Sequence, residues 1–308
     1  MATPAAPVVL VKERESQGQA RSLWQDAVTH VLHDRLTMIA LVVLVILTAA
    51  CVLGPPIIEN ALHIDVNSTN TPDAFLAPGV NNHILGTDHL GRDQLIRLLY
   101  GGRISLAIAY LSSVILVLIG VSLGLLAGFY GGWVDDAITW IVNTLNSLPS
   151  LFLYLVIAAL FQPSVEALIL ILALTGWVGT SRLVRGEALS LKERDFVLAA
   201  QALGASNLRL LVYHIFPNLM SIVIVTGSII AGNLILLESG LSYLGAGVQP
   251  PTPTWGNMLT DSRTYFVQGV HLVVWPGVLI LVTVMCFYLV GDGMRDALDP
   301  HHSRHTRD

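Results

Sequence analysis

Residues 104–127 read ISLAIAYLSSVILVLIGVSLGLLA, and no side chain in this run carries a charge. An α-helix rises about 1.5 Å per residue, so a helix of this length crosses the ~30 Å hydrocarbon core of a bilayer. The whole chain shares this character, because 54% of its 308 residues are hydrophobic, 12% are charged and the mean hydropathy is +0.68. The sequence therefore predicts an integral membrane protein.

Five further apolar runs meet the same criterion of length, although the fourth of the six is short. Pro149 lies inside the third run and predicts a kink there, since proline cannot continue the helical hydrogen-bond ladder. The predicted fold is an all-α integral membrane protein of about six transmembrane helices. The predicted helices are 36–58, 104–127, 138–160, 165–181, 218–240 and 270–290.

Lysine and arginine are unevenly distributed between these runs, and cytoplasmic segments of membrane proteins are enriched in both. With a cytoplasmic N-terminus, twelve of the 16 basic residues fall inside and four fall outside. We therefore expect both termini in the cytoplasm. The inner residues are Lys12, Arg14, Arg21, Arg35, Arg182, Arg185, Lys192, Arg194, Arg209, Arg295, Arg304 and Arg307, and the outer ones are Arg92, Arg97, Arg103 and Arg263.

This orientation divides the chain into five parts. In order, we expect a cytoplasmic N-terminal segment, the first transmembrane helix, an extracytoplasmic loop, a transmembrane core that contains a cytoplasmic loop at 182–217, and a cytoplasmic tail. The five parts are residues 1–35, 36–58, 59–103, 104–290 and 291–308.

The second half of the loop 59–103 has a helical pattern. Asp88 and Arg92, and likewise Asp93 and Arg97, are acid-before-base pairs four residues apart, as on the surface of a helix. This pattern predicts an interfacial helix that begins near Asp88 and leads into the second span. Such a helix either forms part of an outer gate or simply anchors the second span.

Glycine recurs at every fourth position of the second span, at Gly120, Gly124 and Gly128. Small residues at this spacing let a neighbouring helix approach closely. We expect these glycines to serve helix packing, in preference to transport.

Polar side chains inside the spans are costly in lipid and usually face the bundle interior or a water-filled cavity. Each of them either lines a translocation pathway or makes a hydrogen bond between helices. Glu238, at the outer end of the fifth span, is also compatible with an interfacial position in which it is hydrogen-bonded to the re-entering loop. The pathway candidates are Asn143, Asn146, Thr175, Ser228, Asn233 and Glu238.

Several functions lack support in the sequence. The small net charge of −5 gives no reason to expect nucleic-acid binding. No phosphate-binding G-x-x-x-x-G-K-[ST] loop occurs, so we do not expect this chain to hydrolyse ATP, and H-E-x-x-H does not occur either. Cys51 and Cys286 lie in apolar runs and are expected to be buried. For His301, His302 and His305 we favour a solvated tail over a metal site.

The loop 182–217 carries a distinctive local pattern. Residues 196–203 predict a short helix, Gly204 can adopt the left-handed conformation that ends it, and Ser206 can cap the next helix. The result is a helix, a glycine elbow and a second helix that leads through Pro217 into the fifth span. Such an elbow either contacts a partner protein or lies on the lipid headgroups.

A family resemblance distinguishes between these two interpretations. Residues 199–204 (AAQALG), with Pro217 thirteen residues after the glycine, resemble the EAA signature of permease subunits of bacterial ABC importers. Three further stretches are similar to the C-type permease of the dipeptide, oligopeptide and nickel group, and their order agrees over about residues 30–300. They are 84–93 (ILGTDHLGRD), 240–245 (GLSYLG) and 249–257 (QPPTPTWGN).

The resemblance implies the type I ABC importer permease fold and a coupling role for the elbow, which in that family sits in a groove of a cytoplasmic ATPase. Leu198 stands where the signature usually has Glu, and His214 and Phe216 replace the usual aliphatic residues, so a salt bridge from the first position is not expected. The residues expected to contact the ATPase are Asp195, Ala199, Ala200, Gly204, Ala205 and Ser206.

The resemblance also implies partners and a location. These are a homologous second permease that completes a heterodimeric pathway, two ATPase subunits that bind ATP and Mg²⁺, an extracytoplasmic binding protein, and the bilayer of a bacterial or archaeal inner membrane. No cofactor is expected on this chain. Di- or oligopeptides fit the resemblance best, with nickel second. An ion-coupled secondary transporter would instead be expected to show inverted repeats and buried acidic residues.

Overall fold

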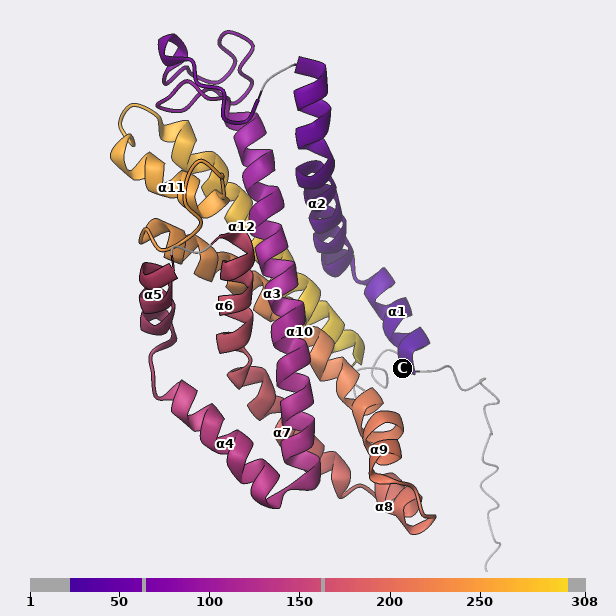
Figure 1. The fold of residues 1–308 in the computed structure, drawn as a ribbon. Coiled ribbons are helices and arrows are strands. Elements are labelled where there is room, and N and C mark those ends of the chain that lie inside the picture. Colours follow the sequence, from indigo (N-terminus) through magenta and orange to yellow (C-terminus); the bar gives the residue numbers. More distant parts are fainter. Residues whose placement is uncertain (1–22, 63–64, 162–163, 299–308) are drawn as a thin grey trace, which may run out of the picture.

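The computed structural model describes residues 23–62, 65–161 and 164–298, and in these residues the chain is an elongated helical bundle without strands. Figure 1 shows the segment 65–93 at one end of the bundle and α8 at the opposite end. The helices are α1 (Leu23–His33), α2 (Arg35–Leu62), α3 (Gln94–Tyr130), α4 (Gly132–Asn146), α5 (Ser150–Phe161), α6 (Val165–Gly176), α7 (Val178–Lys192), α8 (Asp195–Ala202), α9 (Asn207–Arg209), a π-helical turn (Leu210–Ile215), α10 (Phe216–Tyr243), α11 (Trp255–Thr264) and α12 (Val270–Leu298).

Five stretches of these helices are long and apolar enough to cross a membrane, and a sixth is obtained if the bent pair α4 and α5 counts as one span. The prediction of about six transmembrane helices is therefore confirmed. The five stretches are Arg35–Asn60, Gln94–Tyr130, Val165–Lys192, Asn207–Tyr243 and Val270–Leu298.

The third predicted span differs from the expectation of one kinked helix, because α4 and α5 are separate helices at 78° to each other. Pro149 has no N–H and also disfavours helical geometry at the residue before it, so the ladder stops at this point. The amide of Ser147 closes α4 by donating to the carbonyl of Asn143 at 3.0 Å. The proline thus produces a complete break in the span.

The prediction of an interfacial helix from Asp88 is wrong, because α3 begins only at Gln94. The Asp93 carboxylate caps α3 by accepting hydrogen bonds from the amides of Leu95 and Ile96 at 2.8 and 3.1 Å. The Asp88–Arg92 ion pair does form, with 2.6 Å between Arg92 Nε and Asp88 Oδ2, but it closes a non-helical turn.

Burial explains this difference. Asp88, Arg92, Asp93 and Arg97 are at most 9% exposed, whereas the predicted interfacial helix would have left such charges in water. Asp93 also pairs with His83 at 2.7 Å, and Arg97 lies 3.6 Å from Asp88. Asp88, Arg92 and Arg97 therefore form one buried charge cluster, and Asp93 pairs with His83.

Gly120, Gly124 and Gly128 of α3 face α7. A Cβ placed on Gly120 would lie 2.6 Å from the Thr180 side chain, and one on Gly128 would lie 2.7 Å from the Ala188 side chain. A Cβ on Gly124 would lie 2.6 Å from the carbonyl oxygen of Ser181. No other residue fits at these distances, so the glycines set how closely the two helices approach.

Candidate functional site

The end of α8 has the geometry of a Schellman motif. Gly204 adopts φ +86°, its amide donates to the carbonyl of Gln201 at 2.9 Å, and the amide of Ala205 donates to the carbonyl of Ala200 at 3.1 Å. Glycine adopts this left-handed conformation without steric cost. The chain therefore ends one helix and reverses direction within a few residues.

The next helix starts at once. The Ser206 hydroxyl accepts a hydrogen bond from the amide of Arg209 at 3.4 Å and caps α9. The helix then continues through the π-helical turn into α10, so that Asn207–Tyr243 forms one helix of 37 residues. The wider π turn directly precedes Pro217, which has no N–H to continue the α-helical ladder.

The elbow packs against the helical bundle on one side and is exposed on the other. Val197 is 1% exposed and belongs to a buried cluster that includes Val184 of α7 and Leu210 of the π turn. Leu203 is 90% exposed and Leu208 is 70% exposed. The elbow is therefore a fixed protrusion with an apolar tip, at the end of the bundle remote from the segment 65–93 (Figure 1).

The structure brings together all six residues that the sequence indicated for coupling. Four of them are exposed and two are partly buried along one short surface. The sequence analysis missed Leu203 and Leu208, although two leucines beside a glycine in a polar loop were a usable signal. The exposed residues are Asp195, Ala199, Gly204 and Ser206, and the partly buried ones are Ala200 and Ala205.

Basic residues of α7 attach α4 and the end of α3 to α7, the helix that precedes the elbow. The Arg185 guanidinium donates two hydrogen bonds to Asp135 of α4, at 2.5 and 2.6 Å. Lys192 donates to the carbonyl of Phe129 at 2.7 Å, and Arg182 donates to Asn143 at 3.0 Å. Each of these three basic residues therefore holds a neighbouring helix in place.

The structure does not bring the pathway candidates into one cluster. Thr175 and Ser228 donate to carbonyls of their own helices, those of Ile171 at 2.5 Å and Ile224 at 3.3 Å. Asn143 and Asn146 lie exposed on α4, while Asn233 of α10 accepts a hydrogen bond from Tyr288 of α12 at 2.6 Å. Most of these side chains thus have a partner within the chain.

Glu238 differs from the expectation of an interfacial position, because none of its surface is exposed. Its carboxyl group accepts hydrogen bonds from Ser105 of α3 and Ser242 of α10, at 3.2 and 2.8 Å. The loop that follows α10 covers this side chain, so its position is buried and not interfacial.

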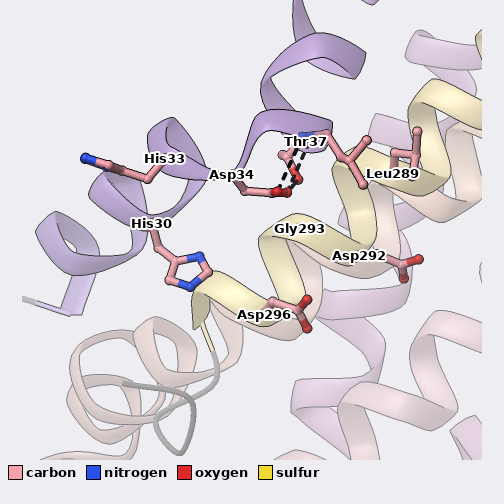
Figure 2. Close-up of a pocket in the computed structure, with 9 residues that line it drawn as sticks. His30, His33, Asp34, Thr37, Leu289, Asp292, Gly293 and Asp296 are labelled. Atoms are coloured by element: carbon pink, nitrogen blue, oxygen red, sulfur yellow. Dashed lines mark hydrogen bonds between the residues drawn. The ribbon is translucent and has the colours of Figure 1, made fainter. Parts of the chain in front are cut away.

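A separate cavity of 430 Å³ lies between α1, α2 and α12 and contains several acidic and histidine side chains (Figure 2). Asp34 accepts hydrogen bonds there from the hydroxyl and the amide of Thr37 and thereby caps α2. The Thr37 hydroxyl, followed by its backbone amide, holds the pKa of Asp34 below its ordinary value. The Asp34 carboxylate therefore stabilises the start of α2.

In the part of the chain that the structure describes, no three His, Cys, Asp or Glu residues are grouped so that they could hold a metal ion. His301, His302 and His305 lie outside the described residues.

Comparison with known proteins identifies the family. A sequence profile described as "binding-protein-dependent transport system inner membrane component" matches residues 120–304, more than half of the chain. The chain belongs to this family. A second profile, the N-terminal transmembrane domain of oligopeptide transport permease C, matches residues 22–78. The resemblance noted in the sequence is thereby confirmed, and the chain is a membrane permease component, a class that is not itself an ATPase.

Relatives match this permease over almost its whole length. It is 36% identical over 300 residues to the oligopeptide transport system permease protein OppC of Bacillus subtilis, covering 97% of this chain and 96% of that one. It is 34% identical to the dipeptide transport system permease protein DppC of Alkalihalophilus pseudofirmus, covering 93% and 92%. The glutathione transport system permease protein GsiD of Pectobacterium atrosepticum is 40% identical over 218 residues, covering 71% and 72%.

The fold also has a solved counterpart. A chain of the MetNI methionine ABC transporter, in an inward-facing conformation, superimposes on the permease with a TM-score of 0.54 at 20% identity. The match covers 66% of this chain and 96% of that one. The predicted ABC importer permease fold is therefore confirmed.

Proposed function

We propose that this permease subunit forms half of a heterodimeric pathway that imports di- or oligopeptides across the cytoplasmic membrane. The observation that carries the proposal is the elbow at Gly204, a fixed protrusion with an exposed apolar tip in a chain whose relatives are peptide permeases. A homologous second permease completes the pathway, and an extracytoplasmic binding protein delivers the peptide.

The elbow couples the permease to an ATPase. Exposed apolar side chains favour a protein partner, because burial of Leu203 and Leu208 in a groove removes apolar surface from water. Asp195 and Ser206 add polar contacts at the rim, while Ala199 and Gly204 let the partner backbone approach closely. Two ATPase subunits bind ATP and Mg²⁺, and their closure moves the two elbows of the permease pair.

The anchoring of the elbow supports this assignment. Val197 connects α8 to α7, and Arg185 connects α7 to α4, so a displacement of the elbow reaches several spans at once. The continuous helix Asn207–Tyr243 carries the same displacement across the membrane. A loop that only lay on headgroups would not need such a rigid attachment.

Peptides are the proposed cargo because the relatives named above transport dipeptides, oligopeptides and glutathione, which is itself a tripeptide. The binding protein selects among them. In the proposed orientation the elbow and both termini are cytoplasmic, and the segment 65–93 faces outward to meet the loaded binding protein.

The proposal is tested with purified components and with cells. Purified alone, the permease is expected to show no ATP hydrolysis, whereas its complex with the ATPase subunits hydrolyses ATP faster when peptide-loaded binding protein is added. Cells that lack other peptide importers are expected to take up labelled di- and tripeptides only when the complete complex is present. Hydrolysis by the isolated subunit, or uptake that persists without the ATPases, would contradict the proposal.

A further inference from the structure

Glu238 joins three parts of the chain that are far apart in sequence. Its two oxygens accept hydrogen bonds from Ser105 of α3 and Ser242 of α10, and the Ser105 hydroxyl in turn accepts from the amide of Trp255 at the start of α11. Ser105, Glu238 and Trp255 have no exposed surface. Buried donors without an acceptor are unfavourable, so both serine hydroxyls depend on this one carboxyl group.

The Ser105 hydroxyl connects Glu238 to the start of α11. The amide of Trp255 donates to this hydroxyl at 3.1 Å, and the hydroxyl donates its one hydrogen to Glu238. The amide of Asn257 donates to the buried Thr254 hydroxyl at 3.1 Å. The first turn of α11, whose amides lack partners within the helix, is therefore linked to the carboxyl through one short relay.

The residues between α10 and α11 form a hairpin that covers Glu238. α10 ends at Tyr243, Gly245 then adopts φ +81°, and the amide of Ala246 donates to the carbonyl of Leu241 at 2.8 Å. Asn257 closes the hairpin by donating to the carbonyls of Val248 and Thr252 at 3.1 and 2.8 Å. The chain thus returns to α3 next to the buried carboxyl of Glu238.

The packing around this hairpin is tight. Trp255 has no exposed surface, and its indole donates to the carbonyl of Leu98 at 2.9 Å. A Cβ on Gly102 of α3 would lie 2.6 Å from the Trp255 ring, and one on Gly256 would lie 2.7 Å from Ser239. The hairpin therefore packs against α3 and α10 in a single arrangement, and it covers the Glu238 side chain.

We propose that Glu238 is a positioning residue that holds the hairpin 244–254 and the start of α11 against α3. Figure 1 shows α11 at the same end of the bundle as the segment 65–93, far from α8. The role of this contact in transport rests on the proposed function, in which the contact between the hairpin and α3 sets the closed position of the extracytoplasmic end of the pathway. The attachment itself does not depend on that function.

The attachment is tested by the reactivity of a buried cysteine in the hairpin. Val248→Cys, at a position that is 5% exposed, is introduced into a Cys51→Ala background, and native Cys286 of α12 remains as an internal reference. The complex is labelled with a thiol reagent in detergent, where both faces are accessible. Glu238→Ala is expected to raise the labelling rate at position 248 about tenfold or more, because it leaves the buried hydroxyls of Ser105 and Ser242 without an acceptor. The rate at Cys286 is expected to stay unchanged.

Matched variants separate positioning from general loosening. Ser105→Ala is expected to act like Glu238→Ala, and the double variant to add little, since both remove the same connection. Ser113→Ala is the control, because this buried serine of α3 donates only to the Tyr110 carbonyl of its own helix. Glu238→Gln keeps an acceptor oxygen on a side chain of the same length. It is expected to restore much of the protection of the cysteine at position 248 against labelling.

Two results would overturn the proposal: unchanged labelling at position 248 in Glu238→Ala, or equal acceleration at position 248 and at Cys286. In cells with the complete complex, Glu238→Ala is expected to lower labelled-peptide uptake about tenfold while the amount of complex is maintained. If the unmodified complex takes up no peptide, the proposed function fails, but the labelling result still decides whether Glu238 holds the hairpin.

Discussion

An added side chain has room at both Gly204 and Gly186, but the two glycines differ in backbone conformation. No atom lies within 4 Å of a Cβ built on either residue, yet Gly204 adopts φ +86° whereas Gly186 lies within helix α7. The same substitution at both positions therefore measures the cost of the left-handed conformation alone. A clash with neighbouring residues would not explain an effect at either position.

Gly204→Val is expected to abolish peptide uptake at near-normal membrane levels. A β-branched side chain at this φ costs roughly 1 kcal/mol or more and tilts the elbow away from its partner. The spans should still insert, because insertion depends on their hydrophobicity. Uptake and co-purification of the ATPase are the measurements, and Gly186→Val is the control that keeps both. Uptake at the unmodified rate in Gly204→Val would show that the elbow does not couple.

The contact between α3 and α7 depends on the absence of side chains at three positions of α3. Gly124 faces the Ser181 carbonyl, whereas Ser122, two residues earlier, is exposed and donates only to the Leu118 carbonyl of its own helix. The two positions lie on different faces of one helix. They therefore offer a matched test of helix packing.

Gly124→Leu is expected to reduce the amount of assembled complex and lower its thermal midpoint. The new side chain overlaps the α7 backbone, and overpacking of this kind typically costs about 1–3 kcal/mol. Ser122→Leu adds a leucine to the exposed face and should leave both quantities near normal. Detergent-solubilised complex is measured by size-exclusion chromatography and by a thermal unfolding assay. Equal losses in the two variants would argue against a packing role for Gly124.

At the scale of elements, hydrophobic length predicted the spans well, because membrane insertion is decided by local composition. The helix expected from Asp88 was not found, since Asp88 and Asp93 bind backbone amides that only the folded turn presents. Burial of Glu238 also escaped prediction, because the hairpin 244–254 covers it from another part of the chain. The elbow itself was predictable, as Gly204 and Ser206 act on their immediate neighbours.

Across the whole molecule, the segment 65–93 and the elbow occupy opposite ends of the bundle (Figure 1). Two exposed serines, Ser68 and Ser190, lie in these two regions and are suitable for cysteine substitution. With a membrane between the two ends, only one of them can face the outside. The distribution of lysine and arginine assigns Ser68 to that side.

A membrane-impermeant maleimide is expected to label Ser68→Cys in intact cells and Ser190→Cys only after permeabilisation. Both variants are made in a background with Cys51→Ala and Cys286→Ala, so that the introduced thiol is the one that reacts. The unsubstituted background is the control for non-specific labelling. Labelling of Ser190→Cys from outside intact cells would reverse the proposed topology.

The helix Asn207–Tyr243 starts at the elbow and ends beside the Glu238 hairpin. At about 1.5 Å per residue it is a rod of ~55 Å, longer than the hydrocarbon core is thick. In mechanical terms it is a lever with loads at both ends, and its one irregularity is the π turn at Leu210–Ile215. If nucleotide-driven closure moves the elbow as proposed, this helix carries the torque to the hairpin 244–254 without crossing a flexible joint, and opening on one side and closing on the other become a single stroke.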